Sequence, residues 1–133
     1  MKKQFTISTL MPASPEKVFK AWLSTQGHTA MTGSPAKVTP RVGGSFSAWD
    51  GYITGKTVEL KPYSRIVQAW RTSEFADTDP DSEIVLTLAP AKGGTKLTLT
   101  HTNIPEGQAE SYESGWDESY FVPMRAYFEG DAG

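Results

Sequence analysis

Cysteine is absent from the chain, which has 133 residues and no Cys. This absence excludes a disulfide framework, a thiol nucleophile and a thiolate metal site. A chain without cysteine is compatible with a reducing compartment, so we expect a cytoplasmic location.

An excess of basic residues is also missing. Lys and Arg together number 13 against 15 for Asp and Glu, which leaves a formal net charge of −2. A nucleic-acid-binding protein or a protein that binds anionic membranes usually carries a basic patch, so we expect no nucleic acid partner.

Long apolar runs are missing as well. No segment approaches the roughly 18 consecutive apolar residues that a membrane-spanning helix needs, so we expect no such helix. At the start, KQFTISTLM alternates apolar residues with Thr and Ser, unlike the continuous core of a signal peptide.

The apolar pattern that is present predicts an α+β fold. Phe5, Ile7, Thr9 and Met11 share one side of an alternating first strand, which Pro12 ends. The following Ser-Pro pair predicts a helix that carries Val18, Phe19, Trp22 and Leu23 on one face, and a short second helix is expected around residues 25 to 31. Six strand-like runs follow, at residues 37–39, 44–49, 52–60, 65–72, 83–89 and 95–102.

Two tight turns connect these runs into hairpins. Asp50-Gly51 and Gly93-Gly94 both favour the positive φ that such turns need. Consecutive hairpins predict an antiparallel sheet with the helices on one face. Its inward side is predicted to carry the following residues: Ile66, Gln68, Trp70, Ile84, Leu86, Leu88, Leu97, Leu99 and His101.

The final amphipathic helix, predicted at residues 114 to 130, contains Pro123 near its middle. Proline cannot donate to the carbonyl four residues earlier, so a bend is expected there. One broad face carries Trp116, Tyr120, Met124 and Tyr127, which indicates that this helix lies across the inward face of the sheet. A cavity can form in the gap under such a bend.

Four segments, in order, resemble the family of activators of heat-shock protein 90 ATPase homologues, within the START-like (SRPBCC) superfamily. They are ASPEKVFKAWLS, RVGGSFSAWDGYITGKTVELKPYSRIVQAWR, GGTKLTLTHTNIP and GWDESYFVPMRAYFEG. The resemblance implies a helix-grip (START-like, Bet v 1-like) fold, in which an antiparallel sheet wraps around a long C-terminal helix. It further implies one domain over residues 1–133, similar to the C-terminal domain of the eukaryotic co-chaperone and without a counterpart of its N-terminal half.

In this superfamily the space between sheet and helix often holds a hydrophobic ligand. The best candidates for lining such a space here are Trp70, His101, Trp116, Tyr120 and Met124. Two alternatives stay open: the tryptophans can serve only as core, and His101 can be a hydrogen-bonded histidine at a strand end. His28 lies in a polar, Gly-bounded stretch and is expected at the surface.

The other motifs in the sequence lack residues that known metal, phosphate or catalytic sites require. The acidic stretch DTDPDSE lacks the glycine and the glutamate that a calcium loop needs at its sixth and twelfth positions. The glycines of VGGSF precede a strand instead of a helix, and no serine lies in a G-x-S-x-G elbow. We therefore expect no bound metal and no cofactor, and we assign a catalytic role to no residue.

The first functional hypothesis is a protein that binds a small hydrophobic or amphipathic molecule and acts in stress response. An alternative is a chaperone-interacting module of the heat-shock protein 90 activator type. A third hypothesis is an enzyme of the cyclase or dehydratase kind that uses the same cavity, with His101 or a carboxylate as the acid or base. The sequence does not indicate the ligand or the oligomeric state.

Overall fold

The structure, a computed structural model, describes residues 3–131. Its seven strands form one antiparallel sheet in the order β1-β7-β6-β5-β4-β3-β2. The strands are β1 Lys3–Met11, β2 Lys37–Val38, β3 Ser45–Ala48, β4 Ile53–Lys61, β5 Arg65–Thr72, β6 Ser82–Ala91 and β7 Gly94–Ile104. The helical segments are α1 Pro15–Trp22, α2 Thr25–Thr32, α3 Ala109–Gly115, η1 Trp116–Phe121 and α4 Val122–Asp131.

Alternation of side chains across the pleat explains which face of the sheet is buried. Ile84, Leu86, Leu97 and Leu99 have no exposed surface, and Thr98 between the last two is only half-buried. This confirms the predicted inward face. In β4 the pairing with β5 shifts between Thr57 and Glu59, a bulge of the kind that increases the local twist of a sheet.

The predicted hairpin turns are present. Asp50 and Gly51 have φ values of 56° and 88°, and Gly93 and Gly94 have 87° and 152°. The left-handed φ of Gly51 and of Gly93 explains why glycine ends both turns. The second turn lies one residue earlier than predicted, because Gly94 already begins β7 and pairs with Ala91.

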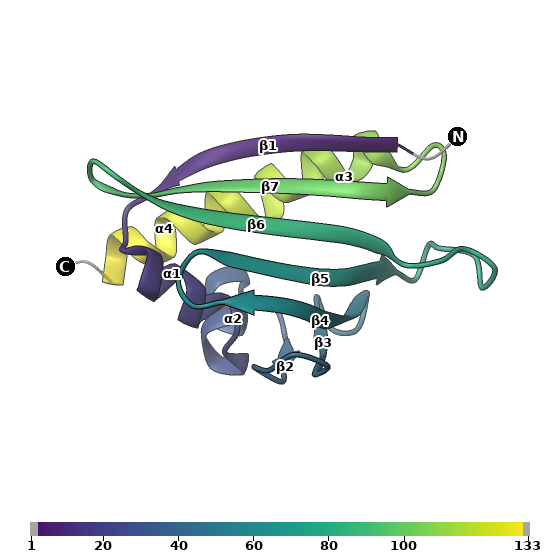
Figure 1. The fold of residues 1–133 in the computed structure, drawn as a ribbon, viewed down its shortest axis with the longest axis horizontal. Coiled ribbons are helices and arrows are strands. Elements are labelled where there is room, and N and C mark those ends of the chain that lie inside the picture. The colour runs from purple at the N-terminus through teal and green to yellow at the C-terminus, as the bar shows by residue number, and fades with distance from the viewer. Residues whose placement is uncertain (1–2, 132–133) are drawn as a thin grey trace.

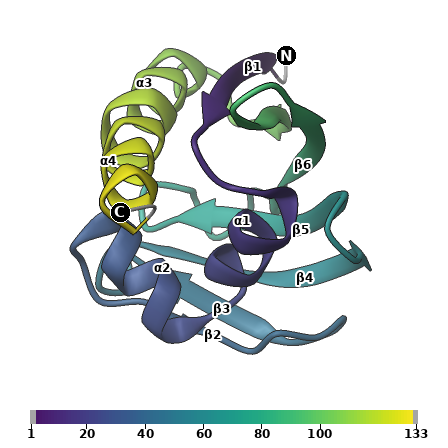
Figure 2. The same ribbon diagram turned by 90° about the vertical axis from the view of Figure 1, so that its left-hand side faces the viewer.

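The two short helices begin and end where the sequence predicts. The Ser14 hydroxyl accepts from the Lys17 amide and Pro15 opens α1. Ser24 caps α2 in the same way, and Gly33 ends it with a left-handed φ of 78°. In Figures 1 and 2 both helices lie on the same side of the sheet as the C-terminal helix.

The C-terminal helix begins at Ala109, earlier than the predicted residue 114. Its irregularity is a π-helical segment, η1, which ends immediately before α4 and Pro123. The Val122 amide donates to the carbonyl of Asp117, five residues back, so the helix widens by one residue just before the proline that cannot donate. The sequence predicts a bend at Pro123, whereas the irregularity that the structure shows is this π-helical segment just before it.

The helix lies across the inward face of the sheet (Figure 1), and its aromatic side chains contact that face directly. The ring centroids of Trp116 and Trp70 of β5 are 5.5 Å apart. Met124 and Phe128, further along, are buried. Within the described residues, no helix is long and apolar enough to cross a lipid bilayer.

Candidate ligand-binding site

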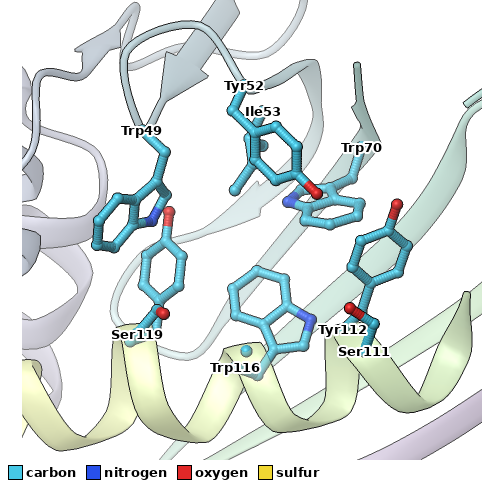
Figure 3. Close-up of a pocket in the computed structure, with 10 residues that line it drawn as sticks. Trp49, Tyr52, Ile53, Trp70, Ser111, Tyr112, Trp116 and Ser119 are labelled. Carbon is cyan, nitrogen blue, oxygen red and sulfur yellow. The ribbon is translucent and has the colours of Figure 1, made fainter. Parts of the chain in front are cut away.

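A pocket of about 430 Å³ opens between the C-terminal helix, the turn from β3 to β4, and β5 (Figure 3). Aromatic side chains supply most of its walls. The lining residues are Trp49, Tyr52, Ile53, Trp70, Ser111, Tyr112, Gly115, Trp116, Ser119 and Tyr120.

The helix wall of the pocket is built from a repeat of four residues. Tyr112, Trp116 and Tyr120 recur at this spacing, and each follows a small residue in the sequence. Side chains four apart share one face of a helix, so the aromatic rings form one stripe and Ser111, Gly115 and Ser119 form a neighbouring stripe with little volume. A Cβ added to Gly115 would have no heavy atom within 4 Å, which shows that space lies beside it.

The opposite wall depends on the turn between β3 and β4. Trp49 and Asp50 both have positive φ, at 53° and 56°, before Gly51 completes the turn. This conformation is uncommon for residues with a side chain. It places Trp49 and Tyr52 on the pocket side (Figure 3), and the rings of Trp49 and Tyr120 approach to 6.3 Å.

Tyr120 is fixed at the inner end of the pocket by His28. The His28 Nδ1 lies 2.9 Å from the Trp22 carbonyl oxygen, which can only accept, so Nδ1 carries the proton. Burial lowers the pKa of His28 and keeps the ring neutral, so its Nε2 accepts from the Tyr120 hydroxyl at 2.8 Å. Burial also raises the pKa of Tyr120, which therefore stays protonated.

Tyr112 is fixed through a second set of hydrogen bonds near the mouth. Its hydroxyl donates to the Gln108 Oε1 at 2.5 Å and accepts from the Thr72 hydroxyl at 2.7 Å. Gln108 in turn donates through Nε2 to the carbonyl of Glu74. Burial raises the pKa of Tyr112 as well.

Tyr52 completes the mouth. Its hydroxyl donates to the carboxylate of Glu74, an exposed residue just after β5. Partial burial, together with this hydrogen bond, raises the pKa of Tyr52 to about 12. The carboxylate of Glu74 therefore contacts a wall residue of the pocket directly.

His101 lies outside the pocket, in the core behind it. The indole N–H of Trp116 donates to His101 Nδ1 at 3.1 Å, so the proton of the neutral ring is on Nε2 and is donated to the Ser82 hydroxyl. Ser82 in turn donates to the Trp70 carbonyl at 2.7 Å. Complete burial lowers the pKa of His101 to about 3, so the ring is neutral. Its role here is to orient Trp116 against Trp70.

The predicted site residues thus divide into two groups. Trp70, Trp116 and Tyr120 line the pocket, whereas His101 and Met124 are fully buried and do not. The prediction for His28 was wrong. It is 3% exposed, because α2 turns its ring toward Tyr120 of the C-terminal helix, a contact between residues 92 positions apart.

Sequence reasoning missed the remaining pocket residues. The signal for Ser111, Tyr112, Gly115 and Ser119 was the repeat of small-aromatic pairs, which needs the helix to begin before residue 114. The signal for Trp49 and Tyr52 was their position on either side of the Asp50-Gly51 turn. Within the described part of the chain, no group of three or more His, Cys, Asp or Glu residues could hold a metal ion.

This fold and pocket define a helix-grip protein of the START-like type, with an aromatic cavity between sheet and helix. The model of the family "Activator of Hsp90 ATPase homolog 1-like protein" matches residues 12–129. The chain therefore belongs to this family.

Curated relatives carry the same name. The human activator of 90 kDa heat shock protein ATPase homolog 1 is 27% identical over 125 residues, which are 94% of this chain and 37% of the human protein. A Dictyostelium discoideum homolog is 30% identical over 86% of this chain and 30% of its own length. The chain thus spans about a third of the length of these relatives.

Solved structures agree on the fold. The crystal structure of an HSP90 activator from Plasmodium falciparum has a TM-score of 0.86 and 30% identity, and the match covers 92% of this chain and 94% of that one. A protein from Chromobacterium violaceum has a TM-score of 0.77 and 27% identity, with 95% and 96% covered. CalU16 from Micromonospora echinospora, at 21% identity and a TM-score of 0.79 over 98% and 79% of the two chains, shows the fold alone.

Proposed function

We propose that this protein binds a small hydrophobic or amphipathic molecule in the pocket between the β3–β4 turn and the C-terminal helix. The observation that carries the proposal is the pocket itself: an open space of about 430 Å³ with aromatic walls. This volume lies within the range of roughly 300 to 1,000 Å³ that is typical of small-molecule sites. A cytoplasmic location, a single domain over residues 1–133 and a role in stress response belong to the same proposal.

The wall residues support ligand binding because they are held in place before any ligand arrives. Tyr112, Trp116 and Tyr120 each use a polar atom to bond to a partner in the protein, namely Gln108, His101 and His28. Side chains that are already ordered lose little conformational entropy on binding. An aromatic cluster that served only as core would not need open space beside Gly115.

The test uses Gly115, where a larger side chain can fill the pocket without meeting another atom first. Gly115→Leu is expected to abolish binding of every compound that the parent protein binds from a panel of lipids, flavonoids, aromatic acids and aromatic amines. The readout is the set of indole N–H signals of Trp49, Trp70 and Trp116 in a proton–nitrogen correlation spectrum.

Gly130→Leu is the matched control, because Gly130 is an exposed helix position outside the pocket and, like Gly115, has no atom near an added Cβ. This variant should bind like the parent. If no compound of the panel shifts the pocket indole signals of the parent protein, the proposal fails.

A second candidate function is interaction with a chaperone. It is favoured by the names of the relatives, which include activators of the 90 kDa heat shock protein ATPase from human and Plasmodium falciparum. A cyclase-like or dehydratase-like activity has less support, because hydrogen bonds engage both ring nitrogens of His28 and of His101.

A further inference from the structure

The hydrogen atoms of the pocket's tyrosine hydroxyls are all engaged with the protein. Tyr52 donates to Glu74, Tyr112 to Gln108 and Tyr120 to His28. The hydroxyl oxygens can therefore only accept from a ligand. The Trp116 indole N–H is committed in the same way to His101.

The remaining neutral donors are few. Ser111 and Ser119 can either donate or accept, and the indole N–H groups of Trp49 and Trp70 can each donate once. Among the described residues that line the pocket there is no Lys, Arg or His. A carboxylate or phosphate on a ligand would lose its water without meeting the charged donors that normally stabilise it.

The charged residues on the helix wall and at the mouth of the pocket are acidic. Glu74 contacts Tyr52 at the mouth, and Asp50 lies in the turn next to Trp49. The helix wall from residue 109 to 121 contains no Lys or Arg, and its exposed charged residues are Glu110, Glu113, Asp117 and Glu118. The nearby cation Arg71 is ion-paired with Asp81 at 2.8 Å.

Aromatic faces and a carboxylate together favour one kind of ligand. The π face of an aromatic ring is negative, so a cation above it is attracted, most strongly by Trp. The rings of Trp49, Tyr52, Trp70 and Trp116 surround the space on several sides (Figure 3).

We infer that the pocket selects amphipathic cations, meaning molecules with an apolar body and an ammonium or similar group, with Glu74 at the mouth as the residue that determines this preference. The inference rests on the proposed ligand-binding function and specifies its ligand class.

The test compares three probes that share a phenyl ring and a two-carbon linker: phenethylamine, phenethyl alcohol and hydrocinnamate. Shifts of the indole N–H signals give the dissociation constants. Trp22 provides an internal reference, because its indole bonds to Gln68 and it does not line the pocket. We expect phenethylamine to bind roughly fivefold tighter than the alcohol, as a screened ion pair and a cation–π contact together allow, and hydrocinnamate to bind most weakly.

Glu74→Gln removes the charge but keeps an oxygen that can accept from Tyr52. This variant should bind phenethyl alcohol like the parent and lose most of its preference for phenethylamine. Glu16→Gln, which removes an exposed carboxylate from α1, should keep that preference. In the parent, added salt should narrow the difference between the two probes.

Each failure has a distinct meaning. If the alcohol or hydrocinnamate binds as tightly as phenethylamine, the inference is wrong and the ligand-binding function stands. If phenethylamine keeps its advantage in Glu74→Gln, the assignment to Glu74 is wrong. If none of the three probes shifts the pocket indoles, the inference fails, and the proposed function fails with it only if the wider panel also shifts none of them.

Discussion

His28 and His101 hold two parts of the same buried aromatic cluster, although only one of them looked internal in the sequence. His101 follows Leu97 and Leu99 in a regular alternation, so its inward direction could be predicted from strand geometry alone. His28 lies in a helix of polar residues, where the direction of a side chain depends on how α2 packs against a segment 92 residues away. No local pattern contains that information.

Both histidines make stability depend on pH. Their pKa values are lowered by burial, that of His101 to about 3, so below pH 6.5 the unfolded chain binds protons that the folded protein does not. Stability is then complete above the unfolded pKa and falls as the pH drops. Between pH 7 and pH 5 we expect the free energy of unfolding, measured by urea denaturation, to fall by about 2 kcal/mol for His101 alone.

His101→Gln should flatten this dependence over the same interval, although it lowers stability at pH 7. An unchanged slope in that variant would show that other groups cause the pH dependence.

Trp116 supplies both a large buried surface and a hydrogen bond to His101. We expect Trp116→Ala to lower the free energy of unfolding by about 3 to 5 kcal/mol, the usual range for truncating a buried large aromatic residue. Urea denaturation at constant pH measures the change. Equal midpoints and equal slopes for mutant and parent would contradict the buried position of this ring, which is 3% exposed.

At the scale of elements, the strands and hairpins were predictable because their signals are local. Alternation of two residues and the positive φ of Asp50-Gly51 and Gly93-Gly94 need no distant contact. The start of the C-terminal helix could not be predicted in this way, because Gln108, the residue before Ala109, makes no side-chain cap hydrogen bond and is not a typical capping residue. A helix predicted to begin at residue 114 leaves out Ser111 and Tyr112, so the predicted site does not contain them.

Gly115 allows a test of the helix that is independent of ligand binding. It has helical φ and ψ values of −62° and −39° and open space beside it. Gly115→Ala should therefore stabilise the protein by about 0.5 to 1 kcal/mol, because alanine loses less backbone entropy on folding. Thermal and urea denaturation both report the change.

Gly51→Ala is the opposite control. Gly51 also has free space for a Cβ, but its φ is 88°. This substitution should destabilise the protein. If both alanine variants shift stability in the same direction, backbone conformation is not the cause.

At the scale of the whole molecule, the chain corresponds to about a third of the human relative that it matches. In general, a protein with two binding modules can contact a partner at two places, which raises the effective concentration of each contact. A protein that activates the chaperone must bind one conformation of it more tightly than the other, and it shifts the equilibrium only by that difference in affinity. A single binding module has less binding energy available for this difference than two linked modules have.

We therefore expect weak or no stimulation of the ATPase of heat-shock protein 90 from the same organism at micromolar concentrations. A coupled ATPase assay with the chain as given is the measurement. A saturable several-fold increase, lost in surface variants that keep their fold, would instead favour the chaperone-interacting function. Adding phenethylamine to the same assay would show whether occupancy of the pocket changes the result.

The pairing of β1 with β7 also matters during biosynthesis. Thr6 and Thr100 lie side by side in the sheet although 94 positions separate them in the sequence. At a translation rate of about 5 to 20 residues per second, β1 leaves the ribosome roughly 5 to 20 s before its partner exists. During that interval its backbone donors and acceptors are open to other chains. The polar outer side of β1, with Gln4, Thr6 and Ser8, reduces the risk that a neighbouring nascent chain takes the place of β7.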